Sequence, residues 1–226
     1  MFTNHQQKYL GLALAALALT GLMATDALAK KRGEPASTFD EGRLEVSYFS
    51  AAAEFRETDD IDYLWTTPGF SFEGKKLTFA SWPEPKFLGK DADERDLSDQ
   101  RLADNMSSDM PEMLEDAFTH AFKDRISVGE GGEIRVEGRI VDCSTGNVGA
   151  KVFVGFGAGS GSTTLDIRFV DAKSGQVLAG MHHRSVSGTT WSTTDSKLVE
   201  WMDDMVYGLA KIGIEKLYAK GDRADE

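Results

Sequence analysis

VFVGFGAGSG (residues 152–161) runs directly into STTLDIRFVD (residues 162–171), and this stretch decides the fold. Its glycines occupy every second position: Gly155, Gly157, Gly159 and Gly161. Alternate side chains of a β-strand point to one face, so one face of this predicted strand is bare backbone. A close neighbour is expected to pack there, either a helix, another chain or a flat ligand.

Three further strands are predicted from alternating apolar and polar residues, over 75–82, 134–143 and 176–186. The compact turn at 171–175 joins the glycine-rich strand to the last of these, and 144–151 contains the turn before it. The three later strands therefore form an antiparallel meander.

Two amphipathic helices complete the pattern. Apolar residues recur every three or four positions from Met106 to Phe122, and again from Leu198 to about Tyr218. Because proline is tolerated only in a first helical turn, Pro111 predicts that the main helix starts near Ser108 or Asp109, with a shorter piece at 98–105. Both stripes need a sheet face, which predicts a two-layer α+β sandwich with a mostly antiparallel sheet and both helices on one face.

The first 29 residues read as a secretory signal peptide. A short polar start with Lys8 precedes an uncharged Leu/Ala/Gly run, and Ala27 and Ala29 mark a cleavage site after residue 29. The alternative is an uncleaved N-terminal anchor. We therefore expect a periplasmic or secreted protein that has no stable membrane insertion after cleavage. The expected organisation is a signal peptide (1–29), a leader and poorly assigned segment (30–74), an α+β domain (75–220) and a charged tail (221–226).

Composition narrows the partners. The formal net charge is −12, which disfavours nucleic acid and anionic lipid surfaces. The single Cys143 cannot form an internal disulfide, and its position in a predicted strand indicates a small buried residue rather than a nucleophile.

The sequence does not match known catalytic or cofactor-binding motifs in residue spacing or in the surrounding secondary structure. The alternating glycines lead into another strand, whereas a dinucleotide loop leads into a helix. No Gly-x-Ser-x-Gly elbow is present. His182 and His183 are adjacent in a predicted strand, so they point to opposite faces and do not form a metal pair. We predict no catalytic residue, metal or cofactor, and retain one candidate pocket formed by His182, His183, Trp191 and Asp195.

Three segments carry a family resemblance: Val154–Gly159, Leu165–Asp171 and Ser174–Leu178. Together they resemble a bacterial envelope protein family known as a domain of unknown function, of the DUF4410 type, mainly over residues 152–178. The resemblance implies an α/β envelope domain without an assigned catalytic residue. This chain lacks the lipobox cysteine of lipoprotein members, so membrane tethering does not follow.

We retain two main functional hypotheses, with metal carriage as a third. The first is a non-enzymatic, envelope-associated binding or assembly module that docks another envelope protein or a second copy through a strand edge or the glycine face. The alternative is a periplasmic hydrolase or small-ligand enzyme, with its site near Trp191, His182, His183 and Asp195.

Overall fold

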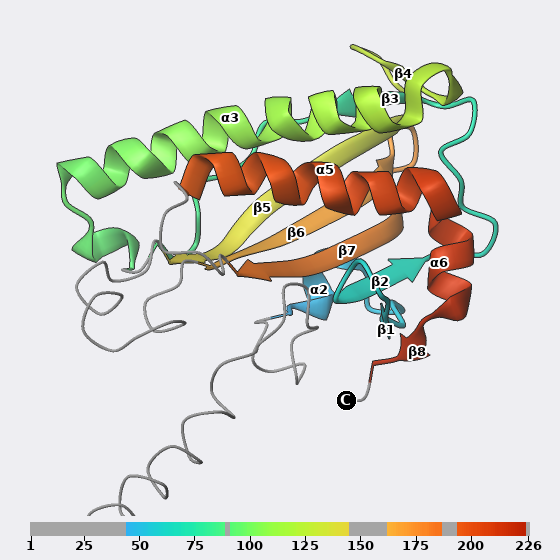
Figure 1. The fold of residues 1–226 in the computed structure, drawn as a ribbon, viewed down its shortest axis with the longest axis horizontal. Helices are drawn as coiled ribbons and strands as arrows, with labels where there is room; N and C mark the ends of the chain where they lie inside the picture. The colour runs from blue at the N-terminus through green and yellow to red at the C-terminus, as the bar shows by residue number, and fades with distance from the viewer. Residues whose placement is uncertain (1–43, 89–90, 145–161, 187–193, 225–226) are drawn as a thin grey trace, which may run out of the picture.

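One eight-stranded sheet forms the centre of the molecule (Figure 1). The computed structural model describes residues 44–88, 91–144, 162–186 and 194–224. The strand order is β4-β3-β5-β6-β7-β2-β1-β8, and only the pairings of β3 with β4 and β5 are parallel among the described strands. The strands are β1 (Arg56–Glu57), β2 (Tyr63–Thr66), β3 (Lys76–Phe79), β4 (Ser127–Val128), β5 (Ile134–Ser144), β6 (Ser162–Asp171), β7 (Val177–Val186) and β8 (Asp222–Arg223).

Two long helices, α3 (Leu97–Phe122) and α5 (Thr194–Ile212), run side by side across one face of the sheet (Figure 1). The order strand, helix, three strands, helix is thus confirmed, as is the mostly antiparallel α+β class. The shorter elements are α2 (Val46–Phe49), α6 (Ile214–Lys220) and two 3-10 turns, η1 (Ala92–Glu94) and η2 (Lys123–Arg125).

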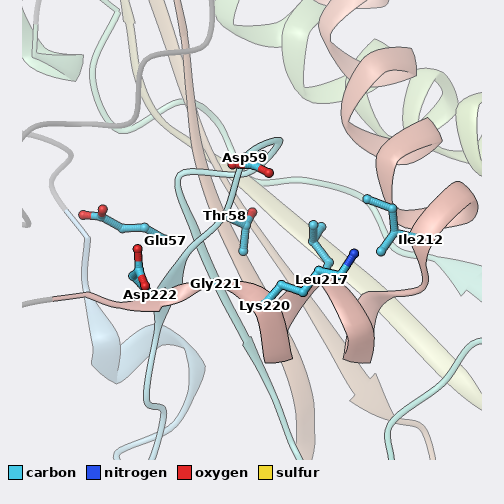
Figure 2. A pocket seen from close by; sticks show the side chains of 8 residues that line it. All are labelled: Glu57, Thr58, Asp59, Ile212, Leu217, Lys220, Gly221 and Asp222. Atoms are coloured by element: carbon cyan, nitrogen blue, oxygen red, sulfur yellow. The ribbon is translucent and has the colours of Figure 1, made fainter.

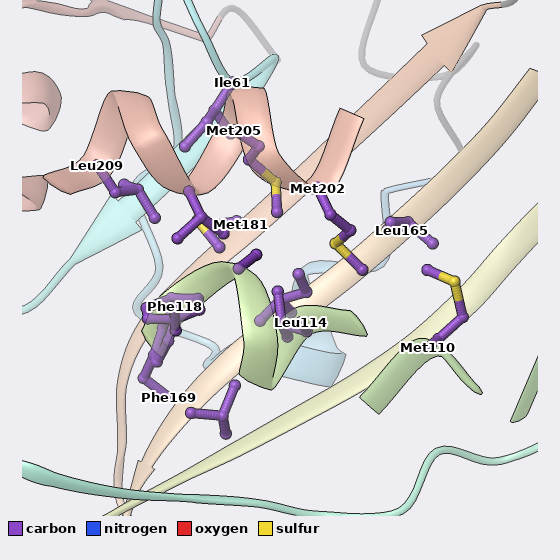
Figure 3. Close-up of a cluster of buried hydrophobic side chains, with 14 of the residues drawn as sticks. Ile61, Met110, Leu114, Phe118, Leu165, Phe169, Met181, Met202, Met205 and Leu209 are labelled. Carbon is purple, nitrogen blue, oxygen red and sulfur yellow. The ribbon is translucent and has the colours of Figure 1, made fainter. Parts of the chain in front are cut away.

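The main core lies between these helices and the inward face of β5, β6 and β7. Figure 3 shows Met110, Leu114 and Phe118 of α3 together with Met202, Met205 and Leu209 of α5. Met106, Met110, Met202 and Met205 are therefore core residues, as the helical spacing of the apolar residues predicted. Aromatic rings fill the centre: Phe72 and Phe169 meet edge to face at 4.8 Å, and Phe118 and Phe122 stack at 5.4 Å.

Helix α3 starts eleven or twelve residues before the predicted Ser108 or Asp109. Asp96 caps the helix, because its side chain accepts hydrogen bonds from the backbone N–H groups of Ser98 and Asp99. The side chain of Asp99 in turn accepts a hydrogen bond from the backbone N–H of Asp96. Pro111 lies inside the helix. The buried residues on both sides of it, Met106 and Met110 before and Leu114 after, pack on one core, and this packing overrides the local cost of proline.

The last predicted helix is two helices rather than one. Gly213 separates α5 from α6 with φ of +92°, a conformation that favours glycine. Beyond this break, Ile214 and Leu217 of α6 lie in the main core.

Two parts of the chain differ from the structure expected from the sequence, and a third lies outside the described residues. The part of the poorly assigned segment that the structure describes, 44–74, supplies α2, β1 and β2, and the expected charged tail supplies β8 beside β1. Strand β6 begins at Ser162, so Gly155, Gly157, Gly159 and Gly161 lie outside the described residues.

Gly138 of β5 gives a test of packing. A Cβ added there would lie 2.1 Å from the buried ring of Trp82, so Gly138→Ala forces the indole or the strand to move. We expect a loss of about 1–3 kcal/mol in unfolding free energy, measured by urea denaturation. The loss should shrink when the same change is made in a Trp82→Ala background. An equal loss in both backgrounds would rule out the ring as its cause.

Candidate functional site

Charged residues occupy the face of the sheet that is turned away from α3 and α5. We call this the charged face and define it by β5, β6 and β7 residues that alternate with the core residues. Strand register places them in cross-strand rows: Glu137 with Arg168, Arg139 with Asp166 and His182, and Asp142 with Thr164 and Arg184. Arg135 extends the face beyond Glu137.

The middle row forms a buried network around Asp166. Arg139 Nε donates to Asp166 Oδ2 at 2.8 Å, and His182 Nδ1 lies 2.6 Å from Asp166 Oδ1. Asp166 and His182 are fully buried, and Arg139 is 7% exposed. Arg139 Nη2, 2.6 Å from Asp166 Oδ2, is a close ionic contact without good hydrogen-bond alignment. The carboxylate of Asp166 on β6 therefore binds a guanidinium of β5 and an imidazole of β7, and so links three neighbouring strands.

The row beside it is built on Glu137. Its two carboxylate oxygens accept from Arg135 Nε at 2.5 Å and from Arg168 Nε at 2.7 Å. Partial burial raises the pKa of Glu137, but these two arginine hydrogen bonds outweigh it and hold the pKa below its ordinary value. Opposite charges thus alternate along and across the strands, which stabilises this register against a slip.

Helix α2 covers the charged face. The ring of Tyr48 lies between two guanidinium groups, 3.8 Å from Arg139 Cζ and 4.3 Å from Arg168 Cζ. Arg168 Nη1 also donates to the carbonyl of Tyr48 at 2.5 Å. Phe49 sits over Gly180, where an added Cβ would approach its ring to 2.4 Å. Burial raises the pKa of the Tyr48 phenol, which fits a ring packed into the sheet.

Just before α2, Glu45 ties this cover to the sheet. Its carboxylate accepts from Lys86 Nζ at 2.7 Å and lies 3.1 Å from Arg139 Nη2. The hydrogen bond from Lys86 lowers the pKa of Glu45 despite partial burial, and Arg139 lowers it further.

The third row and the adjacent His182 of the middle row contain buried polar atoms without hydrogen-bond partners. Asp142 Oδ1, His182 Nε2 and Arg184 Nε are buried atoms with no hydrogen-bond partner. The Arg184 backbone N–H is satisfied, since it donates to Asp62 Oδ2 at 2.6 Å. A buried polar group that finds neither a protein partner nor a water costs about 1–3 kcal/mol.

A shallow hollow of about 260 Å³ lies elsewhere, between the β1–β2 connection and α6 (Figure 2). Ile212 and Leu217 supply apolar surface, and Thr58 donates its hydroxyl to the Ile61 carbonyl at 2.7 Å. Glu57 and Asp222 face each other across the β1–β8 ladder. The lining contains neither histidine nor cysteine, so it offers no assembled base and nucleophile.

The predicted pocket is only partly within the described chain. His182 points to the charged face, whereas His183 points to the other face, where its Nδ1 accepts from the backbone N–H of Asp62 at 3.4 Å. The structure therefore does not bring these two histidines together. Trp191 lies outside the described residues, and Asp195 lies in α5 with its side chain outside the described set.

Sequence reasoning missed the partners of His182. The signal was present, because the alternate residues Arg135, Glu137 and Arg139 change sign along β5, and Asp166 and Arg168 do so along β6. Such patterns favour a cross-strand ion-pair network over a solvated face. Cys143, in contrast, is buried in the main core as predicted, and burial raises the pKa of its thiol.

Two further searches covered the described part of the chain. No three histidine, cysteine or carboxylate side chains there are grouped to hold a metal ion. None of the helices in these segments is long and apolar enough to cross a membrane.

A family model described as a domain of unknown function (DUF4410) matches residues 47–190. Among curated proteins, none matches this chain. Solved structures with a similar arrangement include the PelC dodecamer from Paraburkholderia phytofirmans, at 9% identity and a TM-score of 0.45, over 64% of this chain and 96% of that one. Protein XCC0632 from Xanthomonas campestris, of family DUF330, matches at 11% identity and a TM-score of 0.35, over 67% and 89%. The hypothetical protein CT253 from Chlamydia trachomatis matches at 10% identity and a TM-score of 0.31, over 65% and 97%.

The buried network predicts a large effect of Asp166. Replacing it with alanine leaves a guanidinium and an imidazole buried without their carboxylate, so we expect a loss of about 3–5 kcal/mol in unfolding free energy. Asp203→Asn on the exposed side of α5 is the matched control, with an expected change within about 0.5 kcal/mol. Equal effects of the two substitutions in denaturant titrations would contradict the role given to Asp166.

The lowered pKa of Glu137 predicts that the free energy of unfolding depends on pH. Its folded pKa is depressed, so its contribution to stability is present above the ordinary value of 4.5 and is lost as pH falls through the folded pKa. The stability difference between the wild-type protein and Glu137→Gln should therefore be largest near pH 6 and shrink toward pH 3. A difference that stays constant over this range in chemical denaturation would count against these arginine contacts.

Proposed function

The chain belongs to the family described as a domain of unknown function (DUF4410), and we propose that it is a periplasmic or secreted, non-enzymatic binding or assembly module. Export rests on the N-terminal pattern of residues 1–29. The strongly acidic composition further favours a protein or small-molecule partner over nucleic acid.

One observation carries the non-enzymatic part of the proposal. The Asp166–His182 pair is an arrangement that hydrolases use to orient a general base. Here both side chains are fully buried, and Arg139 binds the second oxygen of the same carboxylate. A substrate has no access to a fully buried imidazole, and a carboxylate shared with arginine stabilises an imidazolium less. The pair is therefore better suited to holding three strands together than to catalysis.

The hydrolase alternative needs His182, His183, Trp191 and Asp195 to converge. His182 and His183 lie on opposite faces of β7, so one pocket cannot use both. The hollow beside α6 contains none of the four residues. The geometry of the two described histidines therefore favours the binding module.

Docking by strand addition is limited to short edges. The outermost strands of the described sheet, β4 and β8, have two residues each, which leaves few free backbone groups for a partner strand. Recognition is therefore expected to use side chains on a face of the molecule.

The proposal is tested with the full chain in a bacterial host. We expect the exported protein to begin at Lys30 by mass spectrometry and to be crosslinked to an envelope protein or to a second copy. Size-exclusion chromatography with light scattering gives its mass in solution. The control is residues 30–226 made without the first 29 residues, which should lose envelope partners. A strict monomer without a recovered partner or bound ligand would refute a binding or assembly role, and hydrolysis abolished by His182→Gln would refute the non-enzymatic role.

A further inference from the structure

The edge of β5 that faces β3 is much longer than the strand paired with it. Strand β5 spans Ile134–Ser144, whereas β3 pairs with residues 134–136 of it. The remaining part of this edge carries backbone groups that another strand can bind, and a long open edge promotes association between copies of a protein. What lies along β5 beyond β3 therefore decides whether this sheet can be extended.

Segment 80–88 lies along this part of β5, and we call it the edge cover. The segment follows β3 directly and keeps contact with β5 without forming a regular strand. Its backbone hydrogen bonds occupy the β5 edge as far as Cys143. The bonded pairs are Ala80 N–H with the Val136 carbonyl (2.9 Å), Lys86 N–H with the Ile140 carbonyl (3.0 Å) and Cys143 N–H with the Phe87 carbonyl (2.9 Å).

The outer side of the edge cover offers little to a further strand. Pro83 and Pro85 have no N–H group to donate. The carbonyl of Pro85 accepts from Arg95 Nη2 at 2.5 Å. The hydroxyl of Ser107 on α3 is shared between the carbonyls of Pro83, at 3.2 Å, and Ala103. Prolines on the outermost chain of a sheet oppose edge-to-edge pairing, and so do side chains that occupy its carbonyls.

Two side chains hold the edge cover in place. Trp82 is 5% exposed, and its indole ring lies against Gly138 in the middle of β5. Arg95 stands just before α3, and its side chain is 1% exposed. Besides the Pro85 carbonyl, Arg95 contacts the carboxylate of Glu84 at 3.4 Å. Trp82 thus fixes the cover to the strand, and Arg95 fixes it to the start of α3.

Without its cover, β5 would be complementary to β5 of a second copy. In an antiparallel pair with twofold symmetry, equivalent residues lie at equal distances on either side of the central residue. With Gly138 at the centre, Glu137 stands opposite Arg139 of the second copy, and Val136 stands opposite Ile140. This register places opposite charges and β-branched side chains across from each other, and both kinds of pair stabilise a sheet.

We propose that the edge cover, held by Trp82 and Arg95, prevents a second copy of this chain from pairing with β5. Assembly of the protein is thereby directed to other surfaces. This protective role goes beyond the proposed binding function, and it does not depend on whether the chain has an envelope partner.

The Trp82→Ala/Arg95→Ala variant of the exported protein tests this role, because it removes both attachments. The Cys143 amide reports opening of the cover, since it donates to the Phe87 carbonyl. In dilute solution we expect its hydrogen exchange, measured by NMR, to be at least tenfold faster than in the wild-type protein. At higher concentration, light scattering should give about twice the wild-type mass, and the Cys143 amide should be protected again.

Met205→Ala/Arg101→Ala is the matched control. It removes one buried side chain of α5 and one exposed arginine of α3, and neither contacts the edge cover. This control should keep the wild-type mass at every concentration. Urea unfolding shows that both variants fold, and Arg95→Ala alone replaces the first variant if that one does not fold, with the same direction of change expected.

Three results would overturn the proposal. Unchanged exchange of the Cys143 amide would show that Trp82 and Arg95 do not hold the cover. Faster exchange without any gain in mass would show that an open β5 edge does not attract a second copy. An equal gain in mass in the Met205→Ala/Arg101→Ala control would assign the association to a general loss of stability.

Discussion

The carboxylate of Asp166 is the contact on which this structure depends. From β6, the strand between them, it binds Arg139 of β5 and His182 of β7. Asp166 and His182 are fully buried, and Arg139 is almost fully buried. Removing charges from water is costly, so such a network stabilises the fold only when every member is held in place. The register of three neighbouring strands follows from that requirement, because a slip by one residue would move the charges into the apolar core.

The same network explains why the two faces of the sheet are covered by different kinds of helix. On one face α3 and α5 pack apolar side chains against β5, β6 and β7. On the other face β5 and β6 carry charged residues, and a large helix with an apolar stripe would leave these residues unsatisfied. Helix α2 is short and contributes the right chemistry: the Tyr48 ring contacts two guanidinium groups, and its carbonyl accepts from Arg168. Phe49 then fills the space above Gly180, where a side chain would not fit.

Hydrogen-bond partners are unevenly distributed over the charged face. Glu137 has two arginine partners and Asp166 has an arginine and a histidine, whereas Asp142 and Arg184 each retain a buried atom without one. Natural proteins keep few such groups, and those that persist have a specific cause, such as an ordered water, an ion, local strain or a catalytic role.

Local sequence patterns determined the class of fold. Period-two alternation located β3, β5 and β7 to within a few residues. The three- and four-residue spacing of apolar residues identified the helical regions of α3 and α5, although not the start of α3, because burial of one face imposes those periods. Tertiary structure alone decided the rest. Pro111 stays inside α3 because packing of the same helix face before and after it outweighs a lost backbone bond, and Gly213 bends the chain because Ile214 and Leu217 gain burial. Likewise, Tyr48 and His182 are more than a hundred residues apart in the sequence. Tyr48 contacts Arg139, and only the pairing of β5, β6 and β7 places Arg139 and His182 on either side of Asp166. The periodicity of one segment does not show which distant segment supplies its charged partners.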